Sequence, residues 1–322
     1  MENKDIMDLV KSGNFWFPEG ISTFAKSADS LFYFILVCSL ILMLGLLAIT
    51  LYFVIKYRRT PKNLVPDKHV THHDVLETTW TVIPTLLVLF IFYWGYKDFL
   101  KISLPPMNAE EIYVVGQKWM WNFDYPKSGK KSMAELVVPV HVPIKLIMTS
   151  KDVLHSFFVP NFRIKRDVVP NRYTRIWFEA QKEGLYHIFC TEFCGDGHSK
   201  MLGAVRVVSE HEYAAWLKGE TEGEAAVPSV ETGKKIYTQM CSACHSLDGS
   251  KMIGPSWKGI FGTKREFVSG ASVDADENYI RESIENPNAK IVKGFAPQMA
   301  SFSGLLSEKE MGSIIEFIKS LK

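Results

Sequence analysis

Two short segments of this chain concentrate the residue types that bind metals and prosthetic groups. The first runs from Cys190 to Met201 and also contains the thiol of Cys194 and the imidazole of His198. His155, which follows a predicted strand, can supply a second imidazole. Thiolate and thioether are soft ligands that suit copper, and a thioether is a poor ligand for zinc. The composition and spacing of this loop therefore favour a copper site.

Three other interpretations of the loop stay open at this point. A structural zinc site made of two Cys and two His leaves Met201 without a role. A disulfide between Cys190 and Cys194 is compatible with a location outside the cytoplasm. A blue-copper site with a single ion needs only one cysteine, so the second thiolate counts against it.

The second segment is Cys241-Ser242-Ala243-Cys244-His245, which has the spacing of a c-type haem attachment motif. Two thiols at this separation add across the two vinyl groups of the porphyrin, and the adjoining imidazole reaches the iron from one face. The segment therefore predicts a covalently bound haem held by Cys241, Cys244 and His245.

The other axial ligand of the iron is expected to be a methionine from elsewhere in the chain. Met299 closes an irregular stretch that begins at Gly294, and the fold can bring it to the opposite haem face. Met240 abuts the attachment site, Met252 follows it closely, and Met311 belongs to the apolar face of a predicted helix. We therefore predict Met299 as the ligand, and Met/His ligation raises the haem potential.

Apolar residues concentrate in the first hundred positions. The segment 31–55 carries no charged residue, and its ~25 residues at ~1.5 Å rise can cross ~30 Å of hydrocarbon. A second span covers about 75–96, with Glu77 near its start and Pro84 inside it, where membrane helices tolerate proline. Residues 1–100 are therefore expected to form an N-terminal segment and a two-helix transmembrane hairpin.

Charge around the hairpin predicts its orientation. The connecting loop is the more cationic side and holds Lys56, Arg58, Arg59, Lys62 and Lys68. Cationic loops tend to stay in the cytoplasm, so both termini are expected outside. The haem motif supports this, because c-type haem is attached outside the cytoplasm. We expect a multi-pass protein of the cytoplasmic (inner) membrane with both extramembrane domains on its outer, periplasmic side.

The rest of the chain divides by composition into two modules and a linker. Residues 108–216 hold short β-rich runs separated by Pro, Gly and Asn, which predicts an all-β sandwich or barrel. Residues 217–228 are acidic and small, as linkers are. Residues 229–322 begin with a helical pattern at Gly233 and end with a helix that opens on a Ser307 capping pattern. Two such helices around the haem motif resemble the class I cytochrome c arrangement, which implies an all-α domain.

The overall charge argues against a nucleic-acid partner. Lys plus Arg (37) nearly balances Asp plus Glu (35), for a net charge of +2. No Rossmann or P-loop glycine pattern follows a credible strand, so nucleotide chemistry has no support either.

The copper loop resembles that of subunit II of cytochrome c oxidase, whose Cys-x-Glu-x-Cys-x3-His-x2-Met pattern is matched at every ligand position. The resemblance implies a cupredoxin-like domain with a binuclear copper centre (CuA) in which Cys190 and Cys194 bridge both ions. It implies four further ligands: His155 and His198 cap one ion each, Met201 binds weakly, and Glu192 binds through its backbone carbonyl. It also implies a magnesium ion at the interface with subunit I, held partly by the Glu192 side chain.

Two further stretches carry the same resemblance. The stretch 116–121 is similar to the aromatic segment through which cytochrome c delivers electrons, with Trp119 at the entry position and Lys118 where the family often has Gln. The stretch 77–84 looks like the start of the family's second helix, where an acidic residue lies at the mouth of a proton path. Glu77 is thus a candidate for proton entry, and an interfacial anchor is the alternative.

The fused cytochrome c domain makes the layout resemble the caa3-type oxidases. The resemblance implies electron flow from cytochrome c or another donor through the haem and the copper pair to the haems of subunit I, which reduce O2 to water, with subunit III as a further partner. A copper subunit of a nitric oxide reductase and a stand-alone membrane redox carrier are the alternatives. Subunit II of a quinol oxidase is disfavoured because it lacks these copper ligands.

Overall fold

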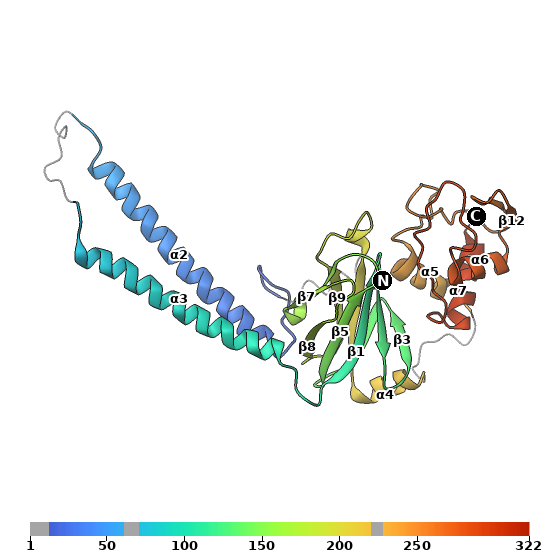
Figure 1. Cartoon of the computed structure of the whole chain (residues 1–322), viewed down its shortest axis with the longest axis horizontal. Helices are drawn as coiled ribbons and strands as arrows, with labels where there is room; N and C mark the ends of the chain where they lie inside the picture. Colours follow the sequence, from blue (N-terminus) through green and yellow to red (C-terminus); the bar gives the residue numbers. More distant parts are fainter. Residues whose placement is uncertain (1–12, 61–70, 220–227, 322) are drawn as a thin grey trace. The chain divides into compact units, whose positions relative to one another are not determined.

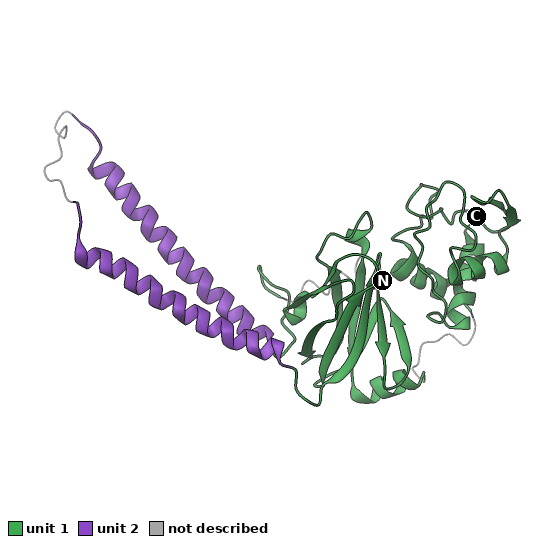
Figure 2. Ribbon diagram, viewed as in Figure 1, with its two compact units in different colours: residues 1–23, 105–322 green, residues 24–104 purple. Residues whose placement is uncertain are grey.

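The computed structural model describes residues 13–60, 71–219 and 228–321 (Figure 1). The chain forms two compact units, one made of residues 24–104 and the other of residues 1–23 and 105–322 (Figure 2). Lys62 and Lys68 of the predicted cytoplasmic loop and most of the predicted linker lie outside the described residues.

The smaller unit is a hairpin of two helices, α2 (Ala25–Lys56) and α3 (Asp74–Ser103). Both helices are long and apolar enough to cross a membrane. They pack through aromatic side chains, with the rings of Phe34 and Phe90 5.4 Å apart. Each predicted span lies within one helix, and Pro84 is accommodated inside α3. The helices run beyond the apolar stretches because helical hydrogen bonding continues into their polar ends.

The larger unit begins with a β-sandwich whose ten strands form two five-stranded sheets (Figure 1). One sheet has the order β3-β2-β1-β5-β8 and the other has the order β4-β10-β9-β6-β7. The strands are β1 (Glu110–Gln117), β2 (Met120–Tyr125), β3 (Lys130–Met133), β4 (Glu135–Pro139), β5 (Pro143–Ser150), β6 (His155–Val159), β7 (Ile164–Val168), β8 (Thr174–Glu179), β9 (Gly184–Cys190) and β10 (Leu202–Val208).

The sandwich core lies between the sheets, and alternate residues are buried along β1, β2, β5 and β9. Trp121 of β2 and Phe157 of β6 are fully buried, and their rings meet edge to face 5.4 Å apart across the two sheets. Short 3-10 helices follow β6 (η1, Pro160–Phe162) and precede β10 (η2, His198–Lys200), and helix α4 (Glu210–Lys218) follows β10. The prediction of an all-β module is confirmed.

The C-terminal domain is built on a crossing of its first and last helices. Helix α5 (Val230–Ile236) continues into a π-helical turn, η3 (Tyr237–Cys241). A two-stranded ribbon, β11 (Lys264–Glu266) and β12 (Ser272–Asp274), precedes α6 (Glu277–Glu285) and α7 (Glu308–Ser320). The predicted capping pattern is a full capping box between Ser307 and Glu310.

A single glycine allows this close crossing. A Cβ atom at Gly233 of α5 would lie 2.0 Å from the backbone oxygen of Ser313 and 2.6 Å from Cβ of Phe317, both in α7. Contacts this short leave no room for a side chain at position 233. Glycine there allows the backbones of α5 and α7 to come into contact. The predicted fold class, a transmembrane hairpin followed by all-β and all-α domains, is confirmed.

Candidate copper and haem sites

The β-sandwich brings the predicted copper ligands to one end of one sheet. Strands β9 and β10 are antiparallel neighbours, so the loop from Cys190 to Met201 that joins them folds back on itself. Strand β6 lies on the other side of β9, with Phe157 opposite Cys190, and β6 begins at His155. The sheet register therefore places His155 beside the loop although they are far apart in sequence.

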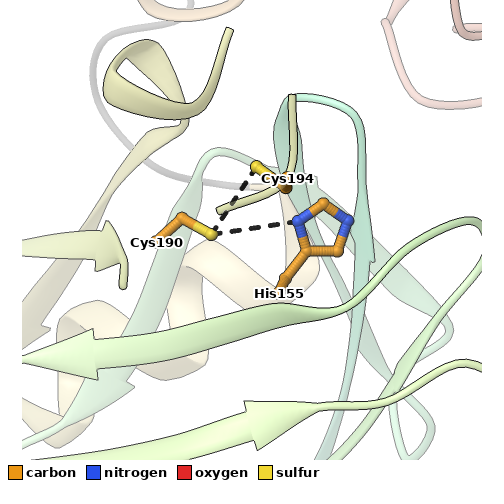
Figure 3. A group of neighbouring side chains, drawn as sticks. All are labelled: His155, Cys190 and Cys194. Atoms are coloured by element: carbon orange, nitrogen blue, oxygen red, sulfur yellow. Dashed lines mark hydrogen bonds between the residues drawn. The ribbon is translucent and has the colours of Figure 1, made fainter. Parts of the chain in front are cut away.

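Three ligand side chains form a tight buried cluster. The ligand atoms of His155, Cys190 and Cys194 all lie within 4.8 Å of one another (Figure 3). The two sulfur atoms are 3.8 Å apart, and Sγ of Cys190 lies 3.9 Å from Nδ1 of His155. A disulfide needs a separation of about 2.05 Å, so both cysteines are free thiols in this structure.

The remaining predicted ligands close the cluster from the loop. Nδ1 of His198 lies 3.5 Å from Sγ of Cys194, and Sδ of the fully buried Met201 lies 3.8 Å from the same sulfur. The backbone carbonyl of Glu192 points at the Cys190 thiol, with its oxygen 3.3 Å from the sulfur. All six predicted metal ligands are thus brought together.

The donor set fits copper rather than zinc. Nitrogen and sulfur ligands 3.9 Å apart can both reach a single ion at bond lengths of about 2.0–2.3 Å. Two thiolates and a buried thioether are soft donors, which suit copper. The thioether of Met201 lies beside the Cys194 thiol, whereas a Cys₂His₂ zinc site is already four-coordinate and needs no thioether ligand.

The two thiols differ in how easily they ionise. Burial opposes ionisation of Cys190, but its contacts with His155 and the neighbouring backbone prevail and lower the pKa of Cys190 to about 6. Burial, together with the charge on Cys190, raises the pKa of Cys194 to about 12. Two adjacent thiolates repel each other, and metal cations held between them relieve that repulsion.

Sequence reasoning missed Asp152, which orients the first imidazole. Oδ1 of Asp152 lies 2.8 Å from Nε2 of His155, and because a carboxylate accepts, Nε2 carries the proton and Nδ1 is left to bind metal. Asp152 also accepts hydrogen bonds from the backbone N–H groups of Lys118 and Val153. Burial raises the pKa of Asp152, but these donors outweigh it and lower the pKa below its ordinary value.

The predicted electron-entry residue lies against the copper loop. A Cβ atom at Gly197 would lie 2.4 Å from the Trp119 ring, and one at Gly195 would lie 3.3 Å from it. The indole therefore covers the loop between Cys194 and His198, and its Nε1 is buried without a partner among the described residues.

Glu77, the predicted proton-entry residue, belongs to the first turn of α3 and is exposed. Its carboxylate accepts the backbone N–H of His73 at 3.0 Å, while the His73 ring accepts the N–H of Leu76 at 3.2 Å. These reciprocal bonds cap the helix, so Glu77 has a structural role there whatever its part in proton transfer.

The haem attachment motif follows the π-helical turn and faces a cavity. Cys241 ends this turn, and the backbone N–H of His245 bonds back to its carbonyl at 3.0 Å. Cys241, Cys244 and His245 all line the cavity, and so does Met299 from its distant loop. The predicted haem ligands thereby line one and the same cavity.

The environment of His245 prepares it to bind iron. Its Nδ1 lies 2.7 Å from the carbonyl oxygen of Pro255, which can only accept, so Nδ1 carries the proton and Nε2 keeps its lone pair. Burial lowers the pKa of His245, which favours the neutral ring that a metal ligand must be. A Cβ atom at Gly254 would lie 2.6 Å from the ring, so glycine allows this close cover.

The choice among the methionines is consistent with the cavity. Met299 lines it, whereas Met311 is buried in the helical core and Met252 is not among the lining residues. Met240 also lines the cavity, next to the attachment cysteines in sequence. Most of the other lining side chains are apolar, including Trp257, as a porphyrin requires.

Comparisons with protein families agree with this division of the chain. Residues 10–97 match the transmembrane domain of cytochrome c oxidase subunit II, residues 131–208 match its periplasmic domain, and residues 230–322 match cytochrome c. The two subunit II matches together cover about half of the chain.

Individual relatives carry the same description. Cytochrome c oxidase subunit 2 of Alkalihalophilus pseudofirmus is 29% identical over 314 residues, which covers 91% of this chain and 86% of that protein. The subunit 2 of Cereibacter sphaeroides is 27% identical over 277 residues, covering 73% of this chain and 91% of that protein. The solved periplasmic domain of subunit II of the Bradyrhizobium japonicum cytochrome oxidase is 33% identical, covers 36% of this chain and 96% of that chain, and has a TM-score of 0.35.

Proposed function

The chain belongs to the cytochrome c oxidase subunit II family and carries a cytochrome c domain, and from this premise we propose that it is the electron-entry subunit of an O2-reducing oxidase. Membership of the family implies copper, a membrane location with a domain outside the cytoplasm, and association with other oxidase subunits. The cytochrome c domain implies haem. In the proposed function, haem c and the CuA pair pass single electrons from a donor to the haems of subunit I, where O2 becomes water.

The convergence of the copper ligands is the observation that carries the proposal. Cys190 and Cys194 would bridge two copper ions, and His155, His198, Met201 and the Glu192 carbonyl would complete their coordination. Asp152 orients His155. The pairing of β6 with β9 limits the movement of His155 and Cys190 relative to each other. A site that rearranges little favours fast electron transfer, because little energy is spent on moving atoms.

On the haem side, Cys241 and Cys244 would hold the porphyrin covalently. His245 would bind the iron through Nε2 and Met299 would bind it from the other face. Trp119 would receive electrons for the copper pair, since its ring covers the copper loop.

The proposed function also implies an orientation in the membrane and contacts with partner subunits. Lys56 at the end of α2 and Arg58 and Arg59 just after it support a connecting loop in the cytoplasm, and with it both soluble domains on the periplasmic side of the inner membrane. Glu77 would lie at the entrance of a proton path into subunit I, and the Glu192 side chain would help hold magnesium there. Subunits I and III and cytochrome c or another donor are the proposed partners.

The experiment is to purify the chain with its membrane partners and to measure gas consumption with a reduced donor. We expect O2 uptake, loss of that uptake in Cys194→Ser, and an unchanged haem c spectrum in the variant. Cys38→Ser, which changes a cysteine of the membrane helix, is the matched control and should retain full uptake. Consumption of NO in place of O2 would assign the chain to a nitric oxide reductase, and the lack of a large haem-bearing partner would leave a stand-alone carrier.

A further inference from the structure

A short loop that precedes the membrane hairpin exposes two neighbouring aromatic side chains. Loop 13–18 is closed by an antiparallel bridge between its end residues and by a hydrogen bond of 2.8 Å from the backbone N–H of Asn14 to the carbonyl of Phe17. Phe15 and Trp16 occupy the tip, with exposed fractions of 90% and 53%. Their rings meet edge to face 5.1 Å apart, so the two side chains form one apolar projection.

The sequence of the loop keeps the turn in one shape. The side chain of Asn14 accepts hydrogen bonds from the backbone N–H groups of Trp16 and Phe17, both at 2.9 Å. Asparagine is favoured at the start of such turns because its side chain can bond to the backbone two residues further on. A Cβ atom at Gly13 would lie 2.4 Å from the carbonyl oxygen of Phe17, so glycine allows the loop to close. The two aromatic rings are therefore carried by a well-defined turn.

Hydrogen bonds also hold the base of the loop on the β-sandwich. The guanidinium of Arg163 donates to the carbonyl of Pro18 at 2.8 Å. The backbone N–H of Ile21 donates to the carbonyl of Asn161 at 2.9 Å, and the carbonyl of Ile21 accepts the N–H of Gln181 at 2.7 Å. Because the chain is bonded to the sandwich on the C-terminal side of the turn, the tip has little freedom to fold back and bury its rings.

A single exposed apolar side chain is common on protein surfaces, but this tip has further properties that point to lipid. None of residues 13–18 is charged, and the carboxylate of Glu19 is paired with Lys182 at 2.9 Å. Trp16 precedes the first residue of α2 by nine positions, and α2 is long and apolar enough to cross a membrane. Aromatic residues, and Trp above all, concentrate next to membrane helices at the boundary between lipid and water, since an indole has an apolar body and a polar N–H.

We propose that Phe15 and Trp16 insert into the outer lipid–water interface, as a third contact of the chain with the bilayer beside α2 and α3. The side of the membrane follows from the proposed orientation, but the inference goes beyond electron transfer and does not depend on copper or haem. An uncharged aromatic tip close in sequence to a membrane helix favours lipid over a groove of a partner subunit, and the test separates the two.

The test is photo-crosslinking of the full chain, purified with its partner subunits, in nanodiscs of phosphatidylethanolamine and phosphatidylglycerol. Phe15 is replaced by p-benzoylphenylalanine, and the products of illumination are identified by mass spectrometry. We expect an adduct between residue 15 and a phospholipid. Val268 of the C-terminal domain, 66% exposed, carries the same probe as the matched control and should give no lipid adduct. A cross-link from residue 15 to another subunit, no adduct, or equal lipid adducts at both positions overturns the proposal.

A second measurement needs no variant. Hydroxyl-radical footprinting of the full chain alone, in the same nanodiscs, reports how well water reaches each aromatic ring. Tyr93 of the membrane helix α3 is 61% exposed in the protein and gives the rate of a ring surrounded by lipid. Tyr113 of β1 is 37% exposed and gives the rate of a ring in water. We expect Trp16 to be modified as slowly as Tyr93, and modification as fast as that of Tyr113 overturns the proposal.

Discussion

The copper and haem sites of this chain are built in contrasting ways. The proposed copper ligands come from one loop and the start of one strand, and hydrogen bonds of the β-sandwich hold them within a few ångströms of one another. The proposed haem ligands come from the attachment motif and from the loop between α6 and α7, and they line a cavity with a largely apolar wall. We therefore expect the β-scaffold to organise its site by itself and the helical domain to need the prosthetic group as part of its core.

The largest expected effect is the loss of the haem domain when its haem is absent. In the double variant Cys241→Ala and Cys244→Ala, haem cannot be attached covalently and the cavity is left without it. The domain should lose all of its net stability, which is about 5–15 kcal/mol for ordinary domains. Limited proteolysis should then cleave within residues 229–322 and spare residues 105–219.

The matching double variant at the copper site sharpens this contrast. Cys190→Ala combined with Cys194→Ala should lose copper while the β-sandwich stays resistant to protease, because its core lies between the sheets. Equal protease sensitivity of the two domains in their respective variants would show that both sites depend on their cofactors to the same degree.

A smaller effect is expected where the helices of the haem domain cross. Gly233→Ala puts a methyl group against the backbone of α7, and such overpacking should lower the free energy of unfolding by about 3 kcal/mol. Thermal unfolding followed at the haem band measures it. Lys234→Ala is the control, because this exposed neighbour should change stability by less than about 0.5 kcal/mol. Similar curves for the two variants would mean that the helices do not cross at Gly233.

Replacing the second iron ligand should alter the haem but not the copper. In Met299→Ala the haem potential should drop by an amount on the order of 0.1 V, within the roughly 0.8 V range that axial ligands control. The weak methionine–iron absorption band should disappear as well. If the band persists, the ligand is another methionine, with Met240 next in line because it also lines the cavity.

The smallest effect is expected at Asp152, which acts through His155. Asp152→Asn keeps the shape but removes the negative charge that orients the imidazole, and loss of such a partner typically costs 10–100-fold in metal affinity, or about 1.4–2.7 kcal/mol. Copper competition with a chelator measures it. Asp167→Asn is a control, since this acid accepts hydrogen bonds from Lys165 and Ser156 rather than from a proposed copper ligand. If Asp152→Asn binds copper with unchanged affinity, Asp152 does not contribute to copper binding.

Sequence reasoning can propose the ligands because their identity and spacing are local properties. The copper loop and the haem motif are each a contiguous stretch of sequence. The two membrane helices can be predicted from their apolar composition alone. Strand β2 was not predicted, although Trp121, Phe123 and Tyr125 alternate with polar residues and are all buried. Its aromatic residues are interpreted above as an electron-transfer segment. Their alternation with polar residues also indicates a β-strand.

Other features depend on contacts that a single sequence does not contain. The need for Gly233 arises from Ser313, which lies eighty residues further along the chain. The Nε group of Arg265, which is buried without a hydrogen-bond partner among the described residues, likewise depends on neighbours that only the fold brings around it. Asp152 could have been noticed, since an acidic residue three positions before a metal-binding histidine is well placed to accept its second N–H group.

In the proposed copper centre, Cys190 and Cys194 hold two copper ions that share one unpaired electron. Copper analysis of the purified protein combined with electron paramagnetic resonance measures both the number of ions and the sharing. We expect two copper ions per chain and a hyperfine pattern from two equivalent copper nuclei. Zinc at the site, an S–S bond between the two cysteines, or the hyperfine pattern of a single copper ion would contradict it.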